Sequence, residues 1–338
     1  MTAGDEIRLH LNENPYGPGR RVKAAVRDAA AIAHHYPDLG PLRRRIGALW
    51  GVSAEHVAVG AGGDDILRRA VEATAGAVVA PWPSFSVYRV LAAGRGRAFV
   101  TTELGPDLSA DPEALLDAAE RQGRPGTVLL ANPNNPTGGA RPREQYLDLA
   151  TRLPGWLVVI DEAYGEFRDV PEATAGVADW PANVVVAKTL SKLQALAGLR
   201  VGYAVGPGWA LQAIARLGDE MAVGTVAAAG ALAALDDGVR LARVRRASIG
   251  RRRQLTEALR ARGFDVPATQ TNFVLVRPPI GVDADLLHAA LGREGIRCRR
   301  GGDLGAPGRI RISLGDGPRQ RRLLACLDAV LTALRARG

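Results

Sequence analysis

Short apolar runs alternate with amphipathic stretches along the middle of the chain, and this alternation is the first guide to the fold. Apolar runs lie at 56–61, 76–81, 126–133, 155–164, 183–192 and 201–206. They are rich in valine and do not alternate strictly with polar residues, which is typical of strands buried on both faces. The pattern therefore predicts an α/β fold with a mostly parallel central sheet covered by helices.

The last third of the chain shows a different pattern. A helical region is predicted from residue 206 through 210–235 to 251–263, followed by strands at 271–278 and 309–315 and helices at 284–295 and 318–336. This arrangement predicts a smaller α+β unit. We expect an N-terminal arm (1–27), a large domain (28–228) and a small domain (229–338). No linker-like tract separates the two domains, which favours an active site between them.

Composition and charge exclude several kinds of protein. The net charge of +9 is compatible with nucleic-acid binding. However, the arginines of 251–263 and 319–338 recur at helical spacing among apolar residues, without interleaved aromatic residues, which indicates solvated helix faces. No long uncharged apolar window is present, and the N-terminus is acidic where a signal peptide is basic, so a cytoplasmic location is expected. Cys298 and Cys326 lack the spacing of a zinc site or a disulfide framework and are expected to be reduced.

Polar residues that can carry chemistry follow successive predicted strands. Asn135 lies in the turn 131–139, Asp161 and Tyr164 follow the run at 155–164, and Lys192 follows the run at 183–192. Each signal has a simpler explanation alone, such as a tight turn or a helix N-cap. Together they meet where an open α/β sheet binds its ligands, at the carboxyl ends of the strands.

The chemistry of these residues points to one kind of ligand. A carboxylate at the end of a buried strand needs a cation or hydrogen-bond donors, and a lysine buried there favours its neutral, nucleophilic amine. The guanidinium of Arg200 suits a phosphate dianion, and the glycine-rich turn that opens 60–73 presents a helix N-terminus to an anion. Pyridoxal 5'-phosphate offers a ring nitrogen, a ring oxygen, an aldehyde and a phosphate to these groups.

Ordered motifs between residues 9 and 315 resemble a known family. They include LNENPYGP, YPD, NPNNPTG, DEAYGEF, TLSK with LAGLRVGY, TNFVLV and RIRISLG. The chain resembles fold-type I, class I/II pyridoxal-phosphate aminotransferases, and most closely the histidinol-phosphate aminotransferases. The resemblance implies transfer of an amino group between an amino acid, or an amino-alcohol phosphate, and a keto acid. A decarboxylase or β-eliminating enzyme on the same scaffold, serving specialised metabolism, remains an alternative, because the same cofactor serves all three reactions.

The resemblance also implies residue roles. Lys192 would bind the cofactor covalently and then move the substrate's α proton, Asp161 would face the ring nitrogen, and Asn135 and Tyr164 would flank the ring oxygen. Phe85 would stack on the ring. The residues implied around the phosphate are Gly63, Asp64, Thr189, Ser191 and Arg200.

The remaining implied residues concern the substrate and a second subunit. Arg311 would bind a substrate carboxylate and Arg299 a substrate phosphate, while Asn14 and Tyr16 would close over the substrate. Tyr36 would reach the neighbouring subunit's cofactor, which implies a homodimer. Met221 stands where these enzymes commonly have a tyrosine, which leaves the amino substrate open. The neighbouring His34 and His35 point apart in an extended segment, and no metal site is expected.

Overall fold

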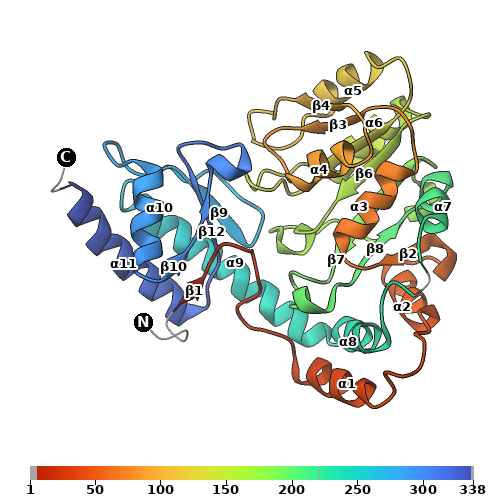
Figure 1. Cartoon of the computed structure of the whole chain (residues 1–338), viewed down its shortest axis with the longest axis horizontal. Coiled ribbons are helices and arrows are strands. Elements are labelled where there is room, and N and C mark those ends of the chain that lie inside the picture. Colours follow the sequence, from red (N-terminus) through yellow and green to blue (C-terminus); the bar gives the residue numbers. More distant parts are fainter. Residues whose placement is uncertain (1–5, 220, 336–338) are drawn as a thin grey trace.

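The computed structural model describes residues 6–219 and 221–335. The apolar runs form strands of one sheet (Figure 1): β2 (Val57–Gly60), β3 (Val78–Pro81), β5 (Thr127–Ala131), β6 (Leu157–Asp161), β7 (Val184–Thr189) and β8 (Gly202–Val205). A further strand, β4 (Phe99–Thr102), lies at one edge and was not predicted, since it is short, mixes apolar with polar residues and is only partly buried. The order is β2-β8-β7-β6-β5-β3-β4, and within the described residues only β8 runs antiparallel to its neighbours. The predicted mostly parallel sheet is confirmed.

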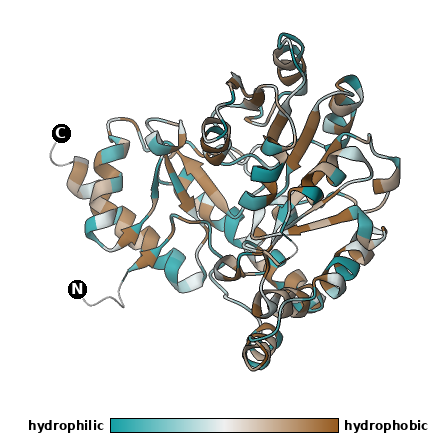
Figure 2. Ribbon diagram, turned by 45° about the vertical axis from the view of Figure 1, so that its right-hand side comes forward, coloured by the Kyte–Doolittle hydropathy of each residue, from teal (hydrophilic) through white to brown (hydrophobic). Residues whose placement is uncertain are grey.

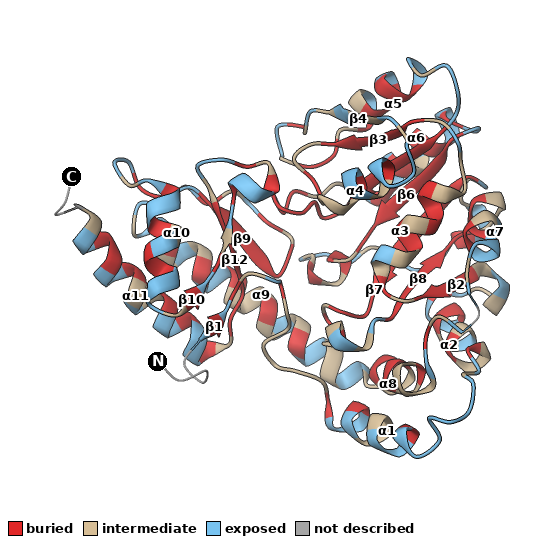
Figure 3. Cartoon of the chain, in the orientation of Figure 1, coloured by how far each residue is buried: buried red, intermediate tan, exposed pale blue. Residues whose placement is uncertain are grey.

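The sheet is buried on both faces, as the apolar runs predict. Successive residues of a strand point to opposite faces: Val158 and Ile160 of β6 enter one core, whereas Leu157 and Val159 enter another. Figure 3 shows the strands of this sheet almost entirely buried, apart from the edge strand β4. The first core is completed by α2 (Gly40–Trp50), α5 (Pro112–Glu120), α6 (Arg143–Arg152) and α8 (Thr225–Leu235). The second is completed by α3 (Gly63–Glu72), α4 (Val87–Ala93) and α7 (Trp209–Arg216).

A smaller α+β unit follows, as expected. Its sheet has the order β11-β12-β9, and a parallel pair β1–β10 lies beside it. The strands are β1 (Ile7–Arg8), β9 (Phe273–Val276), β10 (Ile296–Arg297), β11 (Arg299–Arg300) and β12 (Ile310–Ser313), and the helices are α9 (Gly238–Arg260), α10 (Ala284–Arg293) and α11 (Gly317–Arg335). In Figure 2 the strands of both units are mainly brown, whereas the teal positions lie mostly on helices and loops.

The N-terminal segment contributes to the cores of both units. Ile7 and Leu9, from the expected arm, belong to the core of the small unit. Helix α1 (Arg20–Ala30) packs on α8, and both contribute to a core of the large unit through Val22 and Ala228. Helix α9 then leads into the small unit (Figure 1).

Shorter elements complete the chain. The predicted helical region after residue 206 is three helices, α7, α8 and α9, separated by short non-helical segments. Single turns of 3₁₀ helix lie at Ala54–His56, Gly165–Phe167, Val177–Asp179, Ala197–Leu199 and Gly302–Leu304. Over the two described ranges, no helix has both the length and the apolar character that crossing a membrane requires.

Candidate active site

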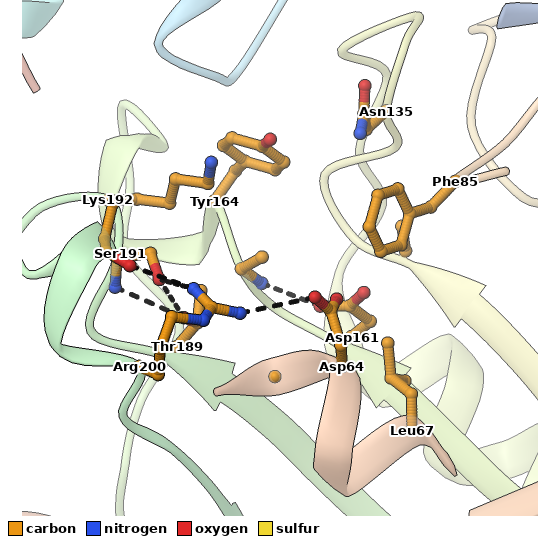
Figure 4. A pocket seen from close by; sticks show the side chains of 14 residues that line it. Asp64, Leu67, Phe85, Asn135, Asp161, Tyr164, Thr189, Ser191, Lys192 and Arg200 are labelled. Carbon is orange, nitrogen blue, oxygen red and sulfur yellow. Dashed lines mark hydrogen bonds and ion pairs between the residues drawn. The ribbon is translucent and has the colours of Figure 1, made fainter. Parts of the chain in front are cut away.

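A cavity of about 170 Å³ lies at the carboxyl ends of β5, β6 and β7. Parallel strands bring the residues that follow them to the same edge of a sheet, so side chains distant in sequence meet there. The cavity is lined by Gly63, Asp64, Leu67, Phe85, Ala131, Asn135, Asp161, Ala163, Tyr164, Thr189, Ser191, Lys192, Ala197 and Arg200 (Figure 4). Of the residues selected for the cofactor, only Tyr36 is not part of this lining.

Asp161 ends β6 with its carboxylate in the protein interior. The Tyr88 hydroxyl donates a hydrogen bond to Oδ2 at 2.9 Å, and the Ala163 backbone N–H donates to Oδ1 at 3.0 Å. Burial raises the pKa of Asp161 to about 6, although both hydrogen bonds oppose this rise. A cation at this carboxylate would offset the cost of burying its charge.

The Tyr164 hydroxyl and the Asn135 amide are each held by a residue from outside the large sheet. The Asn12 side chain donates to the Tyr164 oxygen at 2.9 Å, and Arg311 donates to Oδ1 of Asn135 at 2.6 Å. Because Oδ1 is occupied by Arg311, the amide N–H groups of Asn135 remain available as donors. The Tyr164 ring packs edge-on against Phe273, with 5.1 Å between the ring centroids.

A cluster of polar groups forms where β2 turns into α3. Gly62 precedes the helix with φ 91°, and a Cβ atom there would lie 2.7 Å from a guanidinium nitrogen of Arg200. Arg200 lies within 3.5 Å of Ser191 Oγ and pairs with Asp64 at 3.3 Å (Figure 4). The Ser191 hydroxyl accepts a hydrogen bond of 2.9 Å from Thr189. Hydroxyl groups, a guanidinium and a helix N-terminus together match a phosphate group.

Lys192 differs from the expectation in one respect. It is half-buried rather than buried, because it follows β7 in a loop at the cavity. Its Nζ donates to the Leu11 carbonyl at 3.3 Å and lies 5.6 Å from the centre of the Tyr164 ring. The buried lysine of this strand is Lys188, whose ammonium lies 3.3 Å from Glu166 and 3.6 Å from Glu162.

These residues fit pyridoxal phosphate. Asp161 can face a ring nitrogen, Tyr164 and Asn135 can donate to a ring oxygen, and Lys192 offers a primary amine on the same cavity. The edge with Ser191 and Arg200 suits the phosphate.

Comparison with known proteins decides the family. Residues 4–326 match the sequence profile of the family described as "Aminotransferase class I and II". The chain belongs to this family. It is 35% identical to a histidinol-phosphate aminotransferase of Symbiobacterium thermophilum, over 97% of this chain and 91% of that protein. It is also 35% identical to an aromatic amino acid aminotransferase of Nocardia farcinica, over 92% of this chain and 87% of that one.

A solved structure agrees with the sequence relatives. The histidinol-phosphate aminotransferase from Sinorhizobium meliloti, in complex with pyridoxal-5'-phosphate, superposes with a TM-score of 0.87 at 31% identity. The alignment covers 98% of this chain and 92% of that chain. The protein is therefore a pyridoxal-phosphate-dependent aminotransferase of fold type I, in the histidinol-phosphate aminotransferase-like group.

The residues selected for the substrate lie in several places around this aminotransferase. Arg311 is buried, with one guanidinium nitrogen on the His10 carbonyl at 2.8 Å and with Nε unpartnered. Arg299 lies directly across the strand pair from Arg311, with its side chain 42% exposed. Arg299 pairs with Asp303 at 3.7 Å, and Arg300, the next residue, pairs with Asp285.

Like Arg299 and Arg311, the other three selected residues are not part of the cavity lining. Asn14 donates to the carbonyls of Lys192 and Leu193 at 3.2 and 2.9 Å, so its amide holds the lysine loop. Tyr16 packs against a small apolar cluster that includes Tyr164. Met221 is half-exposed in the loop before α8.

Sequence reasoning missed two residues that contact the site, Tyr88 and Asn12. Tyr88 lies one helical turn after Phe85, at the start of α4, and this spacing could have identified it. Asn12 belongs to the quoted LNENPYGP motif, but nothing in its neighbourhood distinguishes it from Asn14.

Proposed function

We propose that Lys192 is the catalytic amine of this aminotransferase and that Asp161, Tyr164 and Asn135 hold the cofactor's ring. The observation that carries the proposal is that these four side chains, which come from three different strand ends, line one cavity. Phe85 lines the same cavity and would cover one face of the ring. Gly63, Asp64, Thr189, Ser191 and Arg200 would surround the phosphate.

Each group then has a task in amino transfer. The bound cofactor supplies an electron sink for the negative charge that develops at the substrate's α carbon. The Lys192 amine would carry the proton between that carbon and the cofactor, which is general acid–base catalysis by a positioned side chain. The Asp161 carboxylate holds a proton on the ring nitrogen, and its ionised form is stabilised by Tyr88 and by the Ala163 N–H. The donors around the ring oxygen stabilise its negative charge.

Borohydride reduction tests the assignment of Lys192. The chain has only three lysines, Lys23, Lys188 and Lys192. Reduction of the cofactor-loaded protein, followed by protease digestion and mass spectrometry, is expected to place the cofactor's mass on the peptide of Lys192. Retention of the mass in a Lys192→Ala variant, or its attachment to Lys188, would show that another amine binds the cofactor.

We infer that Arg299 and Arg311 together bind the anionic end of the substrate, a carboxylate in an amino acid or the phosphate that takes its place in histidinol phosphate. Arg299 and Arg311 are neighbours across an antiparallel strand pair, which places their side chains on one face of the sheet. Arg311 would bind either group, and Arg299 would contact the phosphate of an amino-alcohol phosphate. Histidinol phosphate is therefore the first amine to test, supported by the relatives that carry this name.

The Nocardia farcinica relative supports a second candidate, an aromatic amino acid. The variant Arg299→Ala separates the two. It is expected to raise KM for histidinol phosphate by 10-fold or more, roughly the loss of one charge-assisted hydrogen bond, and to leave KM for phenylalanine unchanged. Turnover of phenylalanine alone by the unaltered enzyme would favour the second candidate.

We propose that the enzyme acts as a homodimer in which Tyr36 completes the partner's site. Tyr36 is 83% exposed and lies outside the cavity of its own chain, and the nearby Ile32 is also exposed. Mixing Tyr36→Ala and Lys192→Ala chains tests this arrangement. A mixed dimer has one site with both defects and one with neither, so activity is expected to return. Absence of complementation in mixed dimers would contradict a shared site.

We place the enzyme in a reducing compartment, the cytoplasm. Cys298 is buried and Cys326 is partly buried, and both are free thiols. Unpaired cysteines are usual where thiols are kept reduced. Cell fractionation with an antibody to the native chain would test the location.

A further inference from the structure

Asn12 lies next to the cavity although it does not line it. It follows β1 in the N-terminal segment, and only 1% of its surface is exposed. Its φ of 54° lies in the left-handed region, which asparagine tolerates better than most residues. A polar residue buried to this degree needs hydrogen-bond partners, and its partners therefore indicate its task.

Three of the hydrogen bonds of Asn12 reach the small unit. Its backbone N–H donates to Ser313 Oγ at 2.9 Å, and its Oδ1 accepts from the same hydroxyl at 2.8 Å. Its carbonyl accepts from the Asn272 side chain at 3.0 Å. Ser313 ends β12, two residues after Arg311, and Asn272 directly precedes β9. These hydrogen bonds hold Asn12 against the sheet that contains Arg311, the residue proposed to bind the substrate.

The fourth hydrogen bond reaches the large unit, where Nδ2 donates to the Tyr164 oxygen at 2.9 Å. The Ser313 hydroxyl fixes the orientation of the amide, because it gives its only hydrogen to Oδ1 and so turns Nδ2 toward Tyr164. Since the phenol oxygen accepts this bond, the phenol's own hydrogen is not used on Asn12. That hydrogen remains free to be donated into the cavity.

We propose that Asn12 is a positioning residue that directs the Tyr164 hydroxyl onto the cofactor's ring oxygen. The inference rests on the role given to Tyr164 under Proposed function. Asn12 acts only through Tyr164, and it couples that hydroxyl to the small unit through Ser313 and Asn272.

A pH titration of the bound cofactor's absorbance tests the proposal in four proteins. They are the unaltered enzyme, Asn12→Gly, Tyr164→Phe and the double variant; glycine is chosen because it accepts the backbone conformation of residue 12. Loss of a donor leaves the ring oxygen more basic, so each single change is expected to raise the titration midpoint by about one pH unit. The double variant is expected to show the midpoint of Tyr164→Phe and no further change.

Two further variants separate positioning from simple support of the fold. Asn12→Asp keeps an acceptor for Ser313 but presents a carboxylate oxygen to Tyr164, which takes the phenol's hydrogen, so its midpoint is also expected to rise. Asn183→Ala is the matched control. Asn183 is another buried asparagine, whose amide donates to the carbonyls of Ala150, Leu153 and Trp156 at the opposite end of β7. Its loss is expected to lower the melting temperature and leave the midpoint unchanged.

The outcomes distinguish the role proposed for Tyr164 from the role proposed for Asn12. If Tyr164→Phe does not move the midpoint, the role assigned to Tyr164 is wrong and the role of Asn12 fails with it. If Tyr164→Phe moves the midpoint but neither Asn12 variant does, only the inference about Asn12 is wrong. A shift from Asn12→Gly that persists in the Tyr164→Phe background also overturns it, because Asn12 would then act by another route.

Discussion

The Tyr88 hydroxyl donates a 2.9 Å hydrogen bond to Asp161 inside the core of the large unit. The two residues are 73 positions apart, on α4 and at the end of β6. Tyr88 is completely buried, and burial together with the neighbouring carboxylate raises its pKa well above the ordinary value. The phenol therefore stays protonated and acts as a donor to the carboxylate at all ordinary pH values.

Tyr88→Phe is expected to weaken cofactor binding by roughly 10-fold or more, because the ionised Asp161 loses a hydrogen bond worth about 1.5–3 kcal/mol. Equilibrium titration of the apoenzyme with pyridoxal phosphate measures the dissociation constant. Tyr146→Phe is the matched control, since Tyr146 is equally buried and donates to the Ala110 carbonyl at 3.0 Å, away from the cavity. Equal dissociation constants for the two variants would argue against this role of Tyr88.

The stability of the apoenzyme should depend on pH through Asp161. In the folded apoenzyme the pKa of Asp161 is about 6, whereas the ordinary value, expected for the unfolded chain, is 3.8. The folded state therefore favours the protonated acid. The stability due to this group is fully present below pH 4 and is lost as the pH rises through about 6, by roughly 3 kcal/mol. Asp161→Asn removes this loss. Denaturant unfolding of both apoproteins should therefore show a difference that grows between pH 4 and 6 in favour of the variant.

Gly62→Ala is expected to weaken binding of the cofactor's phosphate. The added Cβ would lie 2.7 Å from a guanidinium nitrogen of Arg200, and the alanine would have to adopt a φ of 91°. Gly96→Ala is the control, because Gly96 also has a positive φ, 62°, but no atom within 4 Å of the added Cβ. Both variants should lose stability from backbone strain, about 1 kcal/mol for Gly96→Ala and up to about 3 kcal/mol for Gly62→Ala, because the ψ of 172° at Gly62 lies in a region that is essentially restricted to glycine. An increased dissociation constant for the cofactor is expected only for Gly62→Ala, and a normal one would show that Arg200 adjusts without cost.

Glu162→Gln is expected to destabilise the fold by about 3–5 kcal/mol, because it leaves buried cations without their counter-ion. Glu162 accepts two hydrogen bonds from Arg143, at 2.7 and 3.0 Å, and lies 3.6 Å from the Lys188 ammonium. Arg143 in turn stacks near Trp50 and Trp180.

Chemical denaturation measures the effect of Glu162→Gln, with Glu113→Gln as the control. Glu113 also pairs with an arginine, Arg152, but both side chains are exposed, and its loss should leave the melting temperature nearly unchanged. Lys188 and Arg143 hold the pKa of Glu162 below its ordinary value, although burial of the carboxylate opposes this. The contribution of the pair is therefore present at neutral pH and is lost as the pH falls through that lowered pKa. A small loss on Glu162→Gln would mean that Glu166 compensates for both cations.

Local sequence was a sufficient guide to the main strands and to most of the cavity. Valine-rich runs specify strands buried on both faces, and Asn135, Asp161 and Lys192 each follow such a run directly. In a parallel sheet these positions converge without further information, because the strands all end at one edge. Strand β4 escaped notice because its mixed, half-exposed residues carry no comparable pattern.

The partners of the site residues were decided by tertiary structure. Lys192 was expected to be buried because it follows a buried strand. The loop leaves it half-buried, and the buried lysine is Lys188. Asn12 and Ser313 are separated by 301 positions and meet only because β1 joins the small unit.

By itself, the sequence determined the order of the strands along the chain, the residues at their ends and, through its motifs, the family. Those features depend on short-range patterns of burial and on side-chain chemistry, which any local stretch of chain carries. The tertiary structure decided which hydroxyl supports Asp161, which amide orients Tyr164 and how the N-terminal segment divides between the units. Such contacts depend on the packing of distant segments, which no local pattern encodes.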